Sequence, residues 1–242
     1  MDTIKLKKKK VKMIAHRGLS GIERENTCPA FVAAGNRSYF GIETDVHRTA
    51  DGKYVVIHDE TTKRVSENAN EINVETSSFE DYKNLVLPDI DGSTNRRDTV
   101  IPQLVDYIRI CKKYEKVPVL EIKNRFEKQH LVEVIEIIKA EEYLDKVIFI
   151  SFNLDNCIDL RGLLPDHDIQ FLTSAEIDSE IIETLEKYNL NLDVAYPRLN
   201  SKLIKLLHKK KITVNCWTVN DKDVAKQLVK MGIDYITTNI LE

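Results

Sequence analysis

A regular alternation of short β-branched runs with amphipathic helical stretches is the strongest constraint on the fold of this chain. Strands that are each followed by a helix pair in parallel, and eight such units close into a barrel. The sequence contains eight candidate strands: Val11 to Ala15, Gly41 to Val46, Val117 to Ile122, Val147 to Ser151, Asp168 to Leu172, Asn191 to Ala195, Ile212 to Trp217 and Ile233 to Thr237. We therefore expect an α/β fold, a (β/α)8 TIM barrel.

Helical periodicity fills the gaps between most of these runs, and several helical stretches begin at residues suited to an N-cap. The predicted caps are Asn153, Asp178, Asn200 and Asp221, whose side-chain oxygens accept hydrogen bonds from the free amides of a first turn. A length of 242 residues fits one barrel, since α/β barrels run to about 250 residues as a single domain. We expect one domain over residues 1–242.

One segment interrupts the alternation. An Asp51-Gly52 turn separates the second strand from the apolar run Tyr54 to Ile57, which predicts a hairpin that returns across the barrel mouth and delivers His58. The following residues 60–100 are polar and irregular, and they are too long for an ordinary loop. We expect a small insertion that caps the active face.

Composition narrows the class of protein. A net charge of -3 argues against a nucleic-acid partner, and no run of about 18 apolar residues is present to span a membrane. The N-terminal lysines between Lys5 and Lys12 are not followed by an apolar signal region, so we predict no export signal and assign the basic stub no function. The four cysteines are widely spaced, which favours reduced thiols and a cytoplasmic location. The oligomeric state is not predicted.

Charged residues stand at the ends of two predicted strands. Glu43 and Asp45 are two positions apart, and so are Glu121 and Lys123, so each pair projects from one face of its strand. Catalytic groups of parallel barrels lie at the C-terminal strand ends. We expect these side chains to meet His16, Arg17 and His58 at one barrel mouth.

Three clustered carboxylates repel one another unless a cation lies between them. Glu43, Asp45 and Glu121 are therefore predicted metal ligands for a hard divalent cation that neutralises a phosphate while the two imidazoles transfer protons. A single strand carboxylate is more often solvated or ion-paired, and an alternative role for Lys123 is only to pair with Glu121.

The motifs resemble the glycerophosphodiester phosphodiesterase family. The resemblance extends from about Lys12 to the end of the chain and rests on Ile14-Ala15-His16-Arg17-Gly18, Glu25-Asn26-Thr27, Gly41-Ile42-Glu43-Thr44-Asp45-Val46, Thr49-Ala50-Asp51-Gly52, Val55-Val56-Ile57-His58-Asp59, Ile101-Pro102-Gln103-Leu104, Leu120-Glu121-Ile122-Lys123, Cys216-Trp217-Thr218-Val219-Asn220 and Gly232-Ile233-Asp234-Tyr235-Ile236-Thr237-Thr238. The family fold is a (β/α)8 barrel with a small insertion after the second strand.

This resemblance implies metal-dependent hydrolysis of a small-molecule glycerophosphodiester to sn-glycerol 3-phosphate and an alcohol, with Mg²⁺ or Ca²⁺. By position, it implies that the metal ligands are Glu43, Asp45 and Glu121, that His16 is the base and His58 the acid, and that Arg17 and Lys123 contact the phosphate. Trp217 is expected against the glycerol or alcohol group, although an ordinary core position remains the alternative.

Two positions depart from the family pattern. Arg24 precedes Glu25 where family members often have Pro, and Asn239 follows Thr238 where Asp is common. We expect both to affect the choice of leaving alcohol rather than the chemistry. The sequence leaves open whether water or the substrate's 2-hydroxyl is the nucleophile. The alternative functions are a phospholipid-directed phosphodiesterase of phospholipase D type and an inert phospho-ligand-binding barrel.

Overall fold

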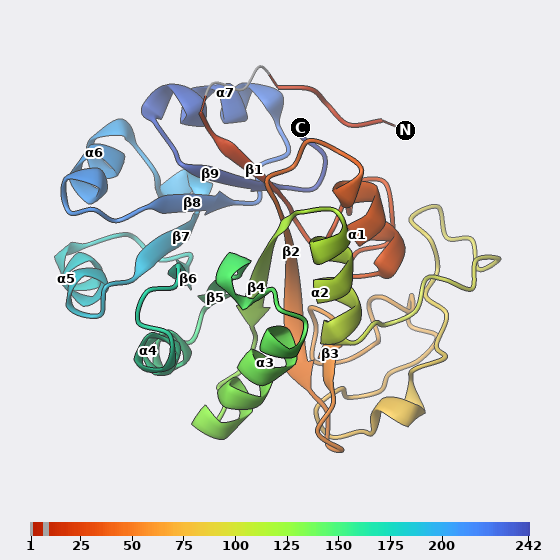
Figure 1. Ribbon diagram of the computed structural model, residues 1–242. Coiled ribbons are helices and arrows are strands. Elements are labelled where there is room, and N and C mark those ends of the chain that lie inside the picture. The colour runs from red at the N-terminus through yellow and green to blue at the C-terminus, as the bar shows by residue number, and fades with distance from the viewer. Residues whose placement is uncertain (1, 7–9) are drawn as a thin grey trace.

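Eight parallel strands form a closed barrel surrounded by helices in the computed structural model, which describes residues 2–6 and 10–242 (Figure 1). The barrel strands are β1 (Lys12–Ala15), β2 (Gly41–Arg48), β4 (Val117–Ile122), β5 (Ile148–Ser151), β6 (Ile169–Thr173), β7 (Asn191–Ala195), β8 (Val214–Trp217) and β9 (Tyr235–Thr238). Each pairs in parallel with its neighbours, and pairing of β1 with both β2 and β9 closes the ring. The expected TIM barrel is confirmed.

In the described part of the chain, seven α-helices lie outside the strands: α1 (Cys28–Gly35), α2 (Leu104–Lys113), α3 (Lys128–Ala140), α4 (Leu154–Leu163), α5 (Ser179–Lys187), α6 (Ser201–Lys209) and α7 (Lys222–Met231). The described residues also form three short 3-10 helices: η1 (Phe79–Asp81), η2 (Leu144–Lys146) and η3 (Tyr196–Arg198). The four predicted N-caps are confirmed, because Asn153, Asp178, Asn200 and Asp221 each accept a backbone hydrogen bond from the first turn of α4, α5, α6 and α7. Such a cap stabilises a helix by about 1 kcal/mol.

The predicted hairpin is also present. β3 (Tyr54–Val56) runs antiparallel to β2, with Val46 opposite Val56, and the amide of Ile57 donates to the carbonyl of Asp45. This pairing fixes the chain so that His58 returns to the end of β2. The residues after it, yellow in Figure 1, form one short helical turn and otherwise irregular chain.

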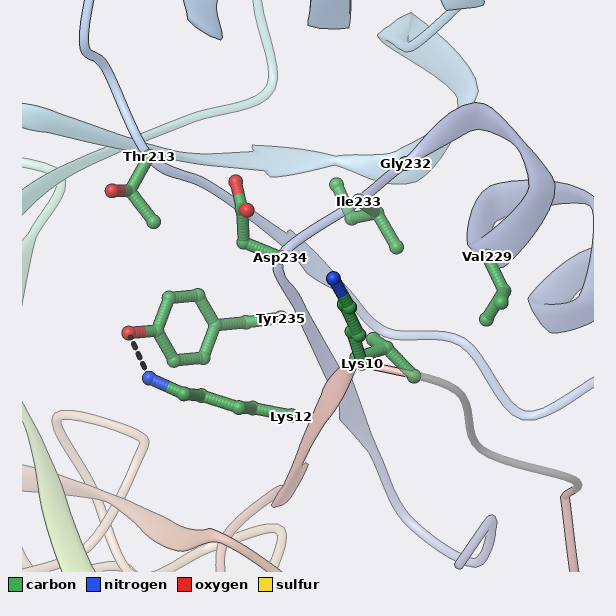
Figure 2. Close-up of a pocket in the computed structure, with 9 residues that line it drawn as sticks. Lys10, Lys12, Thr213, Val229, Gly232, Ile233, Asp234 and Tyr235 are labelled. Atoms are coloured by element: carbon green, nitrogen blue, oxygen red, sulfur yellow. Dashed lines mark hydrogen bonds between the residues drawn. The ribbon is translucent and has the colours of Figure 1, made fainter.

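At the N-terminal ends of the barrel strands, away from His58, lies a cavity of about 560 Å³. Figure 2 shows Lys12 reaching Tyr235 in this cavity, with Nζ 3.3 Å from the phenol oxygen. The same ammonium lies 4.4 Å from the centre of the Phe40 ring, a favourable cation–π distance. Lys7, Lys8 and Lys9 of the basic stub lie outside the described residues. Within the described residues, no helix is long and apolar enough to cross a membrane.

Candidate active site

Three buried carboxylates meet at the C-terminal end of β2 and β4. Glu43 and Asp45 project from β2, and Glu121 projects from β4 directly opposite Asp45. Each offers an oxygen within 4.8 Å of the others, and the residues are only 3%, 1% and 7% exposed. The strand register therefore brings together the three predicted metal ligands.

The proton affinities of these carboxyls reflect their crowding. Burial, followed by the charge of Asp45, raises the pKa of Glu43 well above its usual value and that of Glu121 to about 8. Burial also acts to raise the pKa of Asp45, but Lys123 and Arg17 together hold it below its usual value. Without a further positive charge, the cluster is electrostatically costly in its fully ionised form.

Two cationic side chains touch the cluster. Lys123 Nζ lies 2.7 Å from Glu121 Oε1 and 3.4 Å from Asp45 Oδ1. Arg17 Nε lies 3.5 Å from Asp45 Oδ2, and the Arg17 amide donates to Glu43 Oε2 at 2.7 Å. Both predicted phosphate contacts thus lie beside the predicted metal ligands, within reach of a phosphate bound there.

The turn after β1 shapes this arrangement. Arg17 and Gly18 adopt positive φ angles of 53° and 76°. A Cβ at Gly18 would lie 2.7 Å from backbone and side-chain atoms of Ala30, so only glycine fits without displacing α1. The glycine therefore lets the chain curl tightly enough to aim the Arg17 amide at Glu43.

The charges of the site leave room for a cation. In the ion-pair network of the site, the five carboxylates Glu43, Asp45, Glu121, Glu25 and Asp59 outnumber the three cationic side chains Arg17, Lys123 and Arg64 by two. Asp45 Oδ1 accepts no hydrogen bond from any described residue. A divalent ion would supply the missing charge, and an all-oxygen donor set suits a hard cation such as Mg²⁺ or Ca²⁺. The residues present fit such an ion.

His16 is held by the barrel frame. Its Nδ1 lies 2.7 Å from Asn239 Oδ1, just beyond β9, and its Nε2 lies 4.0 Å from Glu43 Oε2. An amide oxygen only accepts hydrogen bonds, so Nδ1 carries the ring proton and the Nε2 lone pair is available. Burial, then the charge of Arg17, lowers the pKa of His16 to about 4. The ring is therefore a neutral proton acceptor at neutral pH.

His58 is held by a carboxylate instead. Its Nδ1 lies 2.6 Å from Asp59 Oδ1. Burial acts to raise the pKa of Asp59, but hydrogen bonds from Arg64 and from His58 lower it to about 2. Burial also lowers the pKa of His58, while the charge of Asp45 and the hydrogen bond to Asp59 oppose that shift. A carboxylate on Nδ1 stabilises the imidazolium, which is the form that can donate a proton.

Arg64 links the two halves of the site from within the irregular segment. It donates two hydrogen bonds to Asp59, at 2.7 and 3.0 Å, and two to Glu25, at 2.8 and 2.9 Å. Glu25 also accepts a 2.8 Å hydrogen bond from Arg17. A continuous chain of ion pairs therefore runs from the predicted phosphate contact to the second imidazole.

A pocket of about 230 Å³ opens between these groups. Its charged wall consists of His16, Arg17, Glu43, His58 and Glu121, and the rest of its lining consists of Ile150, Phe152, Leu172, Asp193, Trp217 and Thr237. The Trp217 ring meets Phe152 edge to face, with centroids 5.5 Å apart. All eight predicted site residues are brought together, because Asp45 and Lys123 contact the lining residues.

Three contacts were missed from sequence. Asn239 touches His16 itself, a contact that the departure from the family pattern did not predict. Arg64 carried no recognisable motif. His47 lies on β2 with Nδ1 2.7 Å from Glu75 Oε1. The departure at Asn239 was visible in the sequence, but its position beside His16 depends on barrel closure.

The similarity of this chain to known proteins extends over all the residues of the site. The sequence model of the Glycerophosphoryl diester phosphodiesterase family matches residues 16–242. A glycerophosphodiester phosphodiesterase from Caldanaerobacter subterraneus subsp. tengcongensis is 29% identical over 232 residues, covering 95% of this chain and 94% of the relative. The structure of a glycerophosphodiester phosphodiesterase from Thermotoga maritima matches with a TM-score of 0.73 at 26% identity, covering 96% of each chain. That of an Oleispira antarctica phosphodiesterase, in complex with the product sn-glycerol-3-phosphate, has a TM-score of 0.86 at 24% identity and covers 94% of this chain and 92% of that one.

Proposed function

This chain belongs to the glycerophosphoryl diester phosphodiesterase family, and on that premise we propose that it hydrolyses glycerophosphodiesters to sn-glycerol 3-phosphate and an alcohol by metal-dependent acid–base catalysis. The observation that carries this proposal is one pocket that collects His16 and His58 beside the carboxylate cluster. The product named in the Oleispira antarctica complex is consistent with it.

Glu43, Asp45 and Glu121 would hold the divalent cation, Mg²⁺ or Ca²⁺. When bound, such an ion stabilises the negative charge that builds on the phosphoryl oxygens. Arg17 and Lys123 contribute to the same task, since both already contact the cluster and carry donors that can turn to a phosphate oxygen.

His16 acts as the general base and His58 as the general acid. The free Nε2 of neutral His16 takes the proton of the nucleophile, and the His58 imidazolium, stabilised by Asp59, gives a proton to the leaving alkoxide. Each transfer contributes about 10² to 10⁴ in rate. Arg64 keeps Asp59 ionised and so supports the acid role of His58. If water attacks, glycerol 3-phosphate forms directly; if the 2-hydroxyl of the substrate attacks, a cyclic phosphate forms first, and water must open it in a second step in which the two imidazoles exchange roles.

The remaining proposals concern the setting of the site. The chain acts as one domain over residues 1–242, with the insertion of residues 60–100 capping the active face, a role supported by the reach of Arg64 to Glu25. A cytoplasmic location is supported by four free cysteines. The substrate is a small molecule, and neither nucleic acid nor a second protein is part of the proposed reaction.

A coupled assay for glycerol 3-phosphate tests this function. A panel of glycerophosphodiesters with choline, ethanolamine and glycerol as leaving alcohols is incubated with the protein before and after dialysis against EDTA. We expect release of glycerol 3-phosphate that is abolished by chelation and restored by Mg²⁺, Mn²⁺ or Ca²⁺, since oxygen ligands select hard cations. Full turnover in excess EDTA would remove the metal from the mechanism, and no product from any diester would remove the proposed reaction.

A further inference from the structure

The interior of this barrel is polar on one side. TIM-barrel interiors are usually filled by branched apolar side chains, but here four neighbouring strands, β6 to β9, contribute buried polar residues: Gln170, Asp193, Asn215 and Thr237. Asn215 Nδ2 donates to Gln170 Oε1 at 3.2 Å and to Asp193 Oδ2 at 3.1 Å. Thr237 donates to Asn215 Oδ1 at 3.3 Å. These hydrogen bonds satisfy most of the polar atoms of the four side chains and fix the orientation of the side chains.

One atom of this group remains free. Asp193 is 2% exposed, and its Oδ1 has no hydrogen-bond partner among the residues that the structure describes. An unsatisfied buried polar atom costs about 1 to 3 kcal/mol. Asp193 also lines the active-site pocket. Asp193 is therefore a pocket-lining residue with one carboxyl oxygen that no described residue satisfies.

A second residue of the pocket lining also carries an unsatisfied polar atom. Trp217 Nε1 is buried and likewise has no partner within the described part of the chain. Trp217 follows Asn215 by two positions on β8, and Asn215 lies opposite Asp193 in the strand register. The two unsatisfied atoms thus come from neighbouring strands. Around them the pocket is apolar, with Ile150 and Leu172 in its lining.

The position of Asp193 in the barrel indicates which part of a substrate reaches it. Going round the ring from β2, the strand β7 is four strands away in both directions, so Asp193 lies across the barrel from Glu43 and Asp45. A phosphate held by Arg17 and Lys123 beside those carboxylates directs the far end of its substituent toward β7. In a pocket of about 230 Å³ that end is small, and a hydroxyl on it would satisfy Asp193.

We propose that Asp193, with Trp217 beside it, binds the terminal hydroxyl of the substrate's glycerol group and selects glycerol diesters over diesters of unsubstituted alcohols. This inference rests on the proposed function and adds a specificity residue to it. Burial, then the charge of Glu121, raises the pKa of Asp193 well above its usual value, so its carboxyl can donate to a hydroxyl oxygen as well as accept from it. Neither the family assignment nor the predicted site included this residue.

The test compares two inhibitors that differ by one hydroxyl. Inhibition of diester hydrolysis by sn-glycerol 3-phosphate is measured against that by propane-1,2-diol 1-phosphate, which lacks the terminal hydroxyl. In the unaltered protein we expect at least about tenfold tighter inhibition by the hydroxylated compound, since a site built for a hydroxyl is left unpaired without it. In Asp193→Val the ratio should fall close to one, through loss of affinity for glycerol 3-phosphate alone.

Two further variants control the comparison. Gln170→Met alters the same buried polar group at a residue outside the pocket lining, and it should keep the inhibitor ratio. Asp193→Asn keeps the shape and a hydrogen-bonding group, so it should retain part of the ratio and serves as the test if Asp193→Val does not fold. A ratio near one in the unaltered protein, as expected if a water satisfies Asp193, would overturn the inference, and so would an unchanged ratio in both Asp193 variants.

The proposed function is tested separately by the same preparation. If the unaltered protein releases glycerol 3-phosphate from glycerophosphodiesters but does not discriminate between the inhibitors, the reaction stands and the hydroxyl site fails. If it hydrolyses no diester, the proposed reaction is rejected. Calorimetric titration with the two phosphates then still measures whether Asp193 favours binding of the compound that has the terminal hydroxyl.

Discussion

The two imidazoles of the active site are held by different regions of the molecule. His16 follows β1 directly, and its backbone amide donates to the carbonyl of Thr238 in β9 while its ring contacts the amide side chain of Asn239. His58 follows the β3 hairpin, and its ring contacts a carboxylate that is clamped from the insertion by Arg64. The side chain of His16 is 18% exposed, whereas that of His58 is 33% exposed.

This difference assigns different proton chemistry to rings of the same kind. Burial, then the charge of Arg17, lowers the pKa of His16 to about 4, and its amide partner Asn239 carries no charge that would offset this shift as a carboxylate does. A carboxylate partner favours the charged ring and offsets part of the cost of burial at His58. In the proposed mechanism the barrel frame provides the base, and the hairpin with the insertion provides the acid. The partner of each ring then modifies the effect of burial on its pKa.

The largest expected effect is the loss of turnover on removal of either imidazole, and the leaving group of the substrate distinguishes the base from the acid. His16→Ala should lower turnover at least about a hundredfold for both a choline and a 4-nitrophenol diester, because either reaction needs a base. His58→Ala should cost as much with choline but far less with 4-nitrophenol, since nitrophenolate leaves without a proton. The assay is steady-state kinetics on both diesters, with His208→Ala as a control at a surface ring paired with Asp234. Equal losses on the two diesters in His58→Ala would refute the acid assignment.

The next effect concerns the clamp from the insertion. Arg64→Met should lower turnover of the choline diester about tenfold by freeing Asp59 and so misorienting His58, while the 4-nitrophenol diester is much less affected. Arg64→Lys should recover part of the loss, because one of the paired carboxylates can still be contacted. Lys63→Met, which removes the neighbouring ion pair with Glu71, is the matched control. An Arg64→Met enzyme that loses both diesters equally would show that Arg64 acts on the site as a whole.

A third test replaces the amide partner of His16 by a carboxylate and the carboxylate partner of His58 by an amide, and it compares the pH dependence of activity. In Asn239→Asp a carboxylate replaces the amide on His16 and raises its pKa, so the acid limb of kcat/KM should move upward by about one pH unit. In Asp59→Asn the loss of the carboxylate lowers the pKa of His58, so the alkaline limb should move downward. The measurement is a pH profile of each metal-saturated variant. Movement of the same limb in both variants would mean that the two rings do not divide the roles in this way.

The smallest effect is on stability. Burial acts to raise the pKa of Glu25 and of Asp59. Arg64, together with Arg17 at Glu25 and with His58 at Asp59, nevertheless lowers both pKa values to about 2, from about 4 in an unfolded chain. Lowered carboxyl pKa values stabilise the fold above about pH 4, and this stability is lost as the pH falls toward 2. Because Arg64 is half exposed, its removal should cost only about 1 kcal/mol at pH 7. Urea unfolding should show the difference between Arg64→Met and the unaltered protein shrinking toward pH 2.5; a constant difference would contradict the electrostatic explanation.

Most of the framework of the site was predictable from local patterns. The two-residue spacing of Glu43 and Asp45 placed both on one strand face, and the order of strands and helices placed that face at a C-terminal strand end. The Asp51-Gly52 turn predicted the return of His58. These inferences succeeded because strand period, turn chemistry and parallel pairing are decided by residues close together in the chain.

By itself, the sequence determined the barrel and the residues gathered at its mouth, because apolar periodicity and strand-end charges are local properties. Only the tertiary structure decided how those residues are tuned. Asn239 reaches His16 across 223 positions because the barrel closes between β1 and β9, and Arg64 reaches Glu25 across 39 positions because of the path of the insertion. Asp193 meets the pocket only because β7 stands across the ring from β2. Such contacts depend on closure of the whole chain, and no local pattern encodes them.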